Sequence, residues 1–220
     1  MRSRQFYTDI VGLQFVSHSA NGDIYLRCSN LHHDIILTAS RRPGMRRIGW
    51  QMESADALSA LRDSLAATGI AAVDVTPDEA SELGIDGGFR AIDPTTGAEH
   101  EFYSRMAFAD SPFEATHTRI ECLGHIVLAT ANLAASEQFY RDVMNFLESD
   151  RIDDAVVHMR CFPNPLHHTF GLGARSAPAL NHPTFHVTHL DDLRPPGPPI
   201  AAPGLPGSHG PLPPPPRGAG

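Results

Sequence analysis

The pattern of apolar and polar positions changes its period along the chain and predicts alternating strands and helices. Residues 123–131 form an apolar, β-rich run that predicts a strand, and residues 132–147 have apolar positions at helical spacing. Two further strands are predicted at 155–161 and 167–173, separated by a Pro-containing turn at 162–165. This part of the chain therefore predicts a unit of one strand, one helix and short strands.

The same order of elements is predicted elsewhere in the chain. Residues 48–54 predict a strand, and residues 55–69 predict a helix with a terminal glycine. Residues 88–104 predict a hairpin with an Asp-Pro-Thr-Thr-Gly turn. A helix without a preceding strand is predicted from Phe6, and a further unit begins with a strand in residues 179–193.

Three blocks of the first half are echoed in the second half, in the same order and at nearly constant offset. The pairs are FYTDIVGLQF (6–15) with FYRDVMNFLE (139–148), IYLRC (24–28) with VHMRC (157–161), and LHHDIIL (31–37) with LHHTFGL (166–172). The chain is therefore predicted to consist of two related halves. The predicted fold class is α+β, built from repeated strand–helix–strands units.

The repeats and a change of composition predict two domains and a tail. A chain of 220 residues, of which 41% are hydrophobic, is long enough for two small domains with a core each. Residues 1–115 are predicted as a first domain of two units that lacks its first strand. Residues 116–193 are predicted as a second domain, with the third unit and the start of a fourth. Residues 194–220 are rich in Pro and Gly and are predicted to be a disordered tail, so both ends are expected to be cut short.

Charge and cysteine usage exclude several classes of function. The formal net charge of −8 argues against nucleic acid as a partner, because phosphate binding needs a basic surface. The only basic run, at 41–47, is predicted to be a solvated turn. No apolar run reaches the roughly 20 residues of a membrane helix, and the N-terminus has no signal core, so a cytoplasmic protein is expected. Cys28, Cys122 and Cys161 lie far apart, which predicts reduced core thiols.

Histidines on two of the predicted strands are candidates for a metal site. Strand alternation places His125 with Val127 on one face, and it groups His182 with Thr184 and His186 on one face of the later strand. Because each strand opens a repeated unit, His125 and His182 are expected at equivalent places around one cavity. Two neutral imidazoles that face one cavity suit a borderline divalent metal.

A third histidine, His168, lies between these two in the sequence. It is predicted on a strand with Phe170 and Leu172 on its face, and it is interpreted as an acid/base residue that does not bind the metal. The remaining histidines, among them His158 and His186, are interpreted as ordinary surface or hydrogen-bonded residues.

These motifs together resemble those of the type I extradiol dioxygenases. The motifs are Gly-His-Ile (124–126) before a helix that ends in Phe-Tyr-Arg-Asp, His-His-Thr (167–169), and Leu-Asn-His (180–182) running into Thr-His-Leu-Asp-Asp. That family belongs to the vicinal oxygen chelate superfamily, which includes glyoxalases and bleomycin-resistance proteins. The resemblance covers residues 6–193 and implies four βαβββ modules in two domains, with metal in the second domain only.

The resemblance also implies roles for the candidate residues. His125 and His182 would be iron ligands, and His168 would be the second-sphere histidine that assists dioxygen activation and proton transfer. The implied cofactor is Fe(II), with Mn(II) as a possible substitute. The implied reaction is cleavage of a catechol-type aromatic ring beside the diol, with both atoms of O₂ incorporated. A homo-oligomer is implied for the intact protein.

One part of the family's pattern is missing. The third ligand of the family is a Glu on the last strand of the fourth module, a strand that this chain does not contain. Weak iron binding and little turnover are therefore expected. Glu101 occupies the matching place in the first domain, where Arg47 corresponds to His182 by the repeat offset, and Glu101 is interpreted as a remnant of duplication. The alternatives are a metal-free binding protein of the bleomycin-resistance kind and a glyoxalase-like isomerase, neither of which requires His168.

Overall fold

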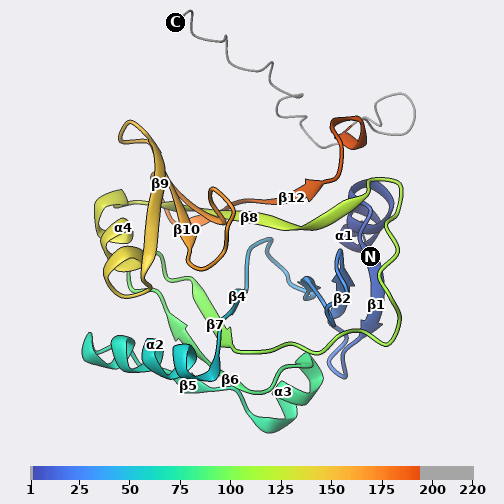
Figure 1. The fold of residues 1–220 in the computed structure, drawn as a ribbon, viewed down its shortest axis with the longest axis horizontal. Coiled ribbons are helices and arrows are strands. Elements are labelled where there is room, and N and C mark those ends of the chain that lie inside the picture. The colour runs from blue at the N-terminus through green and yellow to red at the C-terminus, as the bar shows by residue number, and fades with distance from the viewer. Residues whose placement is uncertain (1, 194–220) are drawn as a thin grey trace, which may run out of the picture.

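Residues 2–193, the part of the chain that the computed structural model describes, form twelve strands in three sheets with helices against them (Figure 1). The predicted tail at 194–220 lies outside the described residues. The helices are α1 (Arg2–Gln5), the π-helix η1 (Phe6–Val11), α2 (Ala55–Ala67), α3 (Pro77–Leu83), α4 (Leu133–Asp142) and the 3₁₀ helix η2 (Leu190–Leu193). The strands of the first half are β1 (Gln14–His18), β2 (Ile24–Arg27), β3 (Ile35–Leu37), β4 (Arg47–Gln51), β5 (Val73–Asp74), β6 (Gly88–Ile92) and β7 (Glu99–Tyr103). The strands of the second half are β8 (Ile120–Thr130), β9 (Phe146–Ile152), β10 (Val156–Cys161), β11 (Phe170–Ala174) and β12 (Ala179–Val187).

The sheet order repeats between the two halves. The four-stranded sheet has the order β4-β7-β6-β5, and the five-stranded sheet has the order β12-β8-β11-β10-β9. In each, the first strand of the unit pairs in parallel with the last, as β4 does with β7 and β8 does with β11. The other pairs are antiparallel, as is β12 against β8. The α+β class with repeated βαβββ units is thereby confirmed, while the domain boundary at 115/116 stays a prediction.

The two longest predicted helices exist, with shorter ends. Ser54 and Asn132 cap α2 and α4, each accepting a hydrogen bond from a backbone N–H three residues later. The second helix ends at Asp142 rather than 147, because Asn145 takes a left-handed conformation (φ 57°) and β9 starts at the next residue. The unpredicted helix α3 begins with a full capping box between Thr76 and Glu79.

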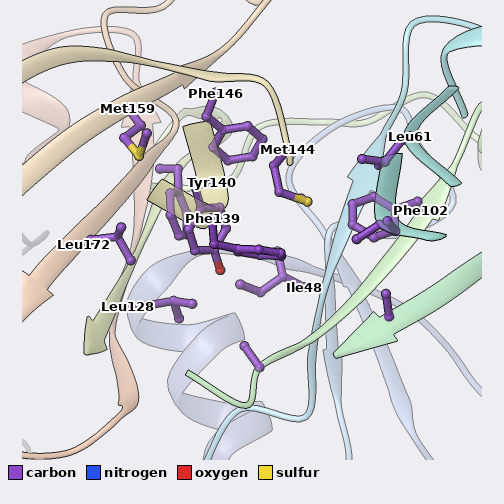
Figure 2. Packing of buried hydrophobic residues seen from close by; sticks show 14 of the residues in the cluster. Ile48, Leu61, Phe102, Leu128, Phe139, Tyr140, Met144, Phe146, Met159 and Leu172 are labelled. Carbon is purple, nitrogen blue, oxygen red and sulfur yellow. The ribbon is translucent and has the colours of Figure 1, made fainter. Parts of the chain in front are cut away.

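One apolar cluster joins the two halves. It contains buried side chains of β4, α2, β6 and β7 together with those of β8, α4, β9, β10 and β11. Figure 2 shows this cluster, with Leu61 and Phe102 from the first half on one side, Tyr140 and Phe146 from the second half on the other, and Ile48 between them. Burial of this apolar surface is the main force that holds module to module.

A chain of hydrogen bonds also crosses this core. The indole N–H of Trp50 donates to Nδ1 of His100 at 2.8 Å, so the proton of the neutral ring is on Nε2. That Nε2–H donates to the Tyr140 hydroxyl at 2.9 Å, and the hydroxyl donates to Asp93 at 3.0 Å. His100, Tyr140 and Asp93 are all buried, so these polar groups depend on each other rather than on water.

The basic run at 41–47 is only partly the solvated turn that the sequence predicts. Arg41 and Arg42 are exposed, but Arg47 begins β4 and its side chain is 16% exposed. Its guanidinium lies 3.0 Å from Glu99 and 2.6 Å from Glu101. The prediction is wrong for Arg47, because strand pairing with β7 turns this side chain toward two carboxylates.

Candidate metal centre

His125 and His182 meet on one face of the five-stranded sheet. They lie on the neighbouring strands β8 and β12, which run side by side along one side of the molecule (Figure 1). Their Nε2 atoms are 3.4 Å apart. Metal–nitrogen bonds to histidine are about 2.0–2.1 Å long, so two ring nitrogens at this separation can share one cation.

The strand register brings these side chains together. Thr184 pairs with His125 and His182 pairs with Val127, after a shift in register between Leu180 and His182. Paired residues point to the same face of an antiparallel sheet, so both imidazoles lie on one side. Pro183 is tolerated beside His182 because β12 is the edge strand of the described sheet.

Neighbouring groups fix the state of the two rings. Nδ1 of His182 lies 3.1 Å from the amide oxygen of Asn181, which can only accept, so Nδ1 carries a proton. The hydroxyl of Thr184 is 2.8 Å from Nε2 of His125. Burial, together with the nearby imidazoles of His168 and His182, lowers the pKa of His125 to about 4. At neutral pH His125 is therefore the neutral imidazole that metals bind.

His168 lies at the same site, but not as the sequence predicts. It belongs to the loop before β11, and its ring centroid is 4.6 Å from that of His125. Phe170 and Leu172 are fully buried in the core, on the other side of the sheet. The prediction that they share a face with His168 is wrong, because strand alternation begins only at Phe170. Burial and neighbouring imidazoles lower the pKa of His168 as well.

The structure adds a fourth imidazole that the sequence did not single out. The ring of His158, on β10, lies 4.5 Å from the ring of His168. His158 pairs with Gly171 on β11, and the missing side chain of Gly171 leaves room for its ring above the sheet, a contact that only the strand register reveals. Nδ1 of His158 is buried and accepts or donates no hydrogen bond within residues 2–193.

The donor set fits a metal only in part. His125 supplies a neutral imidazole, and the Nε2 atoms of His125 and His182 have a spacing that suits one shared cation. Within residues 2–193, no group of three or more His, Cys, Asp or Glu side chains converges closely enough to hold a metal ion. The described residues therefore provide two ligands, and a stable site needs at least one more.

Glu101 is held by arginines instead of a metal. Its Oε2 accepts hydrogen bonds from Arg47 at 2.6 Å and from Arg90 at 2.7 Å. Arg90 also pairs with Glu79 at 2.9 Å. The cations that neutralise this carboxylate are thus two guanidinium groups.

Comparisons with known proteins agree with this arrangement. The family model of the glyoxalase/bleomycin resistance protein/dioxygenase superfamily matches residues 122–194. Biphenyl-2,3-diol 1,2-dioxygenase of Sphingomonas paucimobilis is 26% identical over 204 residues, which cover 86% of this chain and 68% of that protein. An iron-dependent extradiol dioxygenase of Rhodococcus jostii is 25% identical over 207 residues, which cover 86% of this chain and 69% of that protein.

Solved structures show the same fold. The structure of a halotolerant catechol dioxygenase matches with a TM-score of 0.79 and 27% identity, covering 86% of this chain and 66% of that one. A Mn(II)-bound glyoxalase from Novosphingobium aromaticivorans matches with a TM-score of 0.73 and 26% identity, covering 86% of this chain and 62% of that one. The chain thus spans about two thirds of the length of these relatives.

Within residues 2–193, no helix is long and apolar enough to cross a membrane. The fold, the paired histidines and the matched relatives point to the same family. Residues 122–194 form a domain of the glyoxalase/bleomycin resistance protein/dioxygenase superfamily, and homologues of the chain include extradiol dioxygenases.

Proposed function

We propose that this chain carries the metal-binding strands of an extradiol dioxygenase, which opens a catechol-type ring beside its diol and incorporates both atoms of O₂. The observation that supports this most directly is the 3.4 Å approach of His125 and His182, with the ring of His168 against His125. The homology to biphenyl-diol and iron-dependent extradiol dioxygenases supports the same reaction class.

In this proposal His125 and His182 hold Fe(II) through their Nε2 atoms. When bound, Fe(II) would supply a Lewis acid with open positions for the diol oxygens and for O₂. Because the described residues offer two ligands, we expect weak iron binding and little turnover from the chain as given. A carboxylate would complete the ligand set and add the negative charge that retains a dication.

His168 is proposed as the acid/base residue. Its Nδ1 lies 3.0 Å from Nδ1 of His167, so Nε2 is the nitrogen free to face substrate. Its lowered pKa keeps the ring neutral near pH 7, so that Nε2 can accept a proton from a diol hydroxyl and return it later. Such a group typically contributes roughly 10²–10⁴-fold to the rate.

The proposal is tested by iron binding and by ring fission. Equilibrium dialysis with Fe(II) under nitrogen should show weak binding that His125→Ala and His182→Ala abolish. His18→Ala, which removes an exposed histidine far along the chain, serves as the matched control. Stoichiometric iron retention by the His125→Ala variant would contradict the assignment of that ligand.

Ring fission is tested on a chain extended by a fourth module that supplies a Glu. With Fe(II), air and 2,3-dihydroxybiphenyl, a yellow ring-fission product is expected, and His168→Ala should slow its formation by roughly 10²–10⁴-fold. No product from a folded, iron-loaded extended chain would reject the function.

A glyoxalase-like reaction is the second candidate, supported by the likeness to a Mn(II)-bound glyoxalase. It would use His125 and His182 in the same way but would not need His168. Activity on a glutathione hemithioacetal that survives His168→Ala would favour this candidate over ring cleavage.

A further inference from the structure

A cavity lies against the face of β8 and β12 that is opposite to His125 and His182. Its volume is about 390 Å³, within the range of small-molecule sites. Its roof consists of apolar side chains of β8 and β12, namely Leu123, Ile126, Leu180 and Pro183. Ile126 and Pro183 directly follow the two candidate ligands in sequence, so they point to the opposite face of the sheet. The cavity and the histidines therefore share two strands but are separate sites.

The polar part of this cavity is the ion-paired group around Glu101. The side chain of Glu101 is 6% exposed, and those of Arg47 and Arg90 are 16% and 14% exposed. Both hydrogen bonds to Glu101 end on Oε2. Oε1 accepts no hydrogen bond from any described residue, and Glu101 lines the cavity. Glu101 therefore offers a lone acceptor oxygen to the cavity.

Two tyrosine hydroxyls add further polar positions. Tyr25 and Tyr103 line the cavity, and their hydroxyls make no hydrogen bond within the described part of the chain. Burial, assisted by Glu101, raises the pKa of Tyr103 to about 12, so this hydroxyl remains a donor at neutral pH. The cavity thus presents both acceptors and donors that the protein itself leaves unused.

The charges around Glu101 select the kind of ligand. Two guanidinium groups, of Arg47 and Arg90, contact three carboxylates, of Glu79, Glu99 and Glu101. The charged residues that line the cavity are three arginines and five carboxylates, which give a net charge of −2 that repels an anion: Arg46, Arg47, Arg90, Asp23, Asp34, Glu79, Glu82 and Glu101. A neutral hydroxyl satisfies the unused atoms without adding charge, because it donates one hydrogen bond and accepts others. The apolar roof favours a ring attached to that hydroxyl.

We propose that this cavity binds a small neutral aromatic alcohol, such as a phenol or an aromatic diol, without transforming it. The ligand hydroxyl donates to Oε1 of Glu101 and accepts from Tyr103, and the ring lies against Ile126 and Leu180. A bound molecule would contact the rear of the strands that carry His125 and His182. The proposal is independent of ring cleavage, since the cavity needs no metal.

The binding test uses the whole chain with EDTA present, so that no metal site contributes. Saturation-transfer NMR and isothermal titration calorimetry are carried out with phenol, methoxybenzene and benzoate. Phenol is expected to bind, and methoxybenzene is expected to bind about tenfold more weakly because it cannot donate to Glu101. Benzoate is expected to bind most weakly. Absence of phenol binding, or tighter binding of benzoate, would overturn the proposal.

Variants locate the site. His125→Ala and His182→Ala change the other face of the sheet and should leave the phenol affinity within about twofold. Met45→Trp places a larger side chain in the cavity and should abolish binding, with circular dichroism as the check on folding. Glu101→Gln should remove the preference for phenol over methoxybenzene. If that variant does not fold, Met45→Trp decides, and unchanged binding by folded Met45→Trp would refute the site.

Discussion

Replacement of Tyr140 by Phe isolates the hydrogen-bond chain that crosses the core. The Tyr140 hydroxyl accepts from Nε2 of His100 at 2.9 Å and donates to Asp93 at 3.0 Å. The ring of Tyr140 is 0% exposed, so water does not replace the lost hydroxyl. Phe fills the same space as the ring, and the apolar packing therefore remains. The substitution leaves one buried donor, His100, and one carboxylate oxygen with fewer partners.

The magnitude follows from these two losses. An unsatisfied buried donor costs about 1–3 kcal/mol, and a hydrogen bond to a charged group contributes about 1.5–3 kcal/mol. Asp93 retains hydrogen bonds from Thr95, so the second loss is partial. We therefore expect Tyr140→Phe to lower the free energy of unfolding by about 2–4 kcal/mol. For a chain of this size, that corresponds to a decrease in Tm of about 5–15 °C.

Urea unfolding followed by the fluorescence of Trp50 measures this change, since the chain has a single tryptophan. The control is Tyr7→Phe, which removes a hydroxyl that makes no hydrogen bond within the described residues. The control should stay within about 0.5 kcal/mol of the parent. If Tyr140→Phe is also within about 0.5 kcal/mol, the hydrogen-bond chain does not stabilise the core and the reasoning is wrong.

Three other outcomes are expected. Burial lowers the pKa of His100 to about 4 in the folded protein, whereas a histidine in the unfolded chain has a pKa of about 6.5. Between these two pH values the unfolded state therefore binds more protons than the folded state. The urea midpoint should therefore fall as the pH decreases from 6.5 toward 4, and His100→Gln should make this dependence of the midpoint on pH weaker. A midpoint that does not change with pH would contradict the neutral, buried ring. Asn132→Ala removes the cap of α4 and should cost about 1 kcal/mol in thermal melts, whereas Asn132→Asp should cost little; equal losses would argue against the cap. Arg47→Met leaves Glu101 with Arg90 as its remaining partner and should cost about 2–4 kcal/mol in urea unfolding, with exposed Arg41→Met as the neutral control.

The elements that the sequence predicts well are those with a strong local period. The helix at 55–67 and the hairpin at 88–103 follow from amphipathic spacing and from turn residues. The meeting of His125 and His182 was also predictable, because both residues stand on the opening strand of a repeated unit. Residues at equivalent positions on the first strands of two repeated units become neighbours in space, whatever sequence lies between those strands.

The failures have a common physical cause, which is that a local pattern does not show tertiary contacts. His168 was assigned to a strand face, but it lies in the loop before β11, outside the strand alternation, and its ring contacts that of His125 at a tilted angle. Arg47 was grouped with its exposed neighbours, yet its burial depends on carboxylates more than fifty residues away. The helix at 77–83 was missed for another reason, because Thr76 and Glu79, which form its capping box, can be recognised in the sequence.

The position of Pro183 in β12 has a consequence for how separate copies of this chain behave. In the described sheet β12 has a neighbour on one side only, so its outer main-chain groups are available for pairing with another strand. Proline has no N–H and interrupts the ladder that such pairing would need. Pro183 thus protects the outer edge of β12 from intermolecular strand addition, while the strand's inner side still aligns His182 with β8.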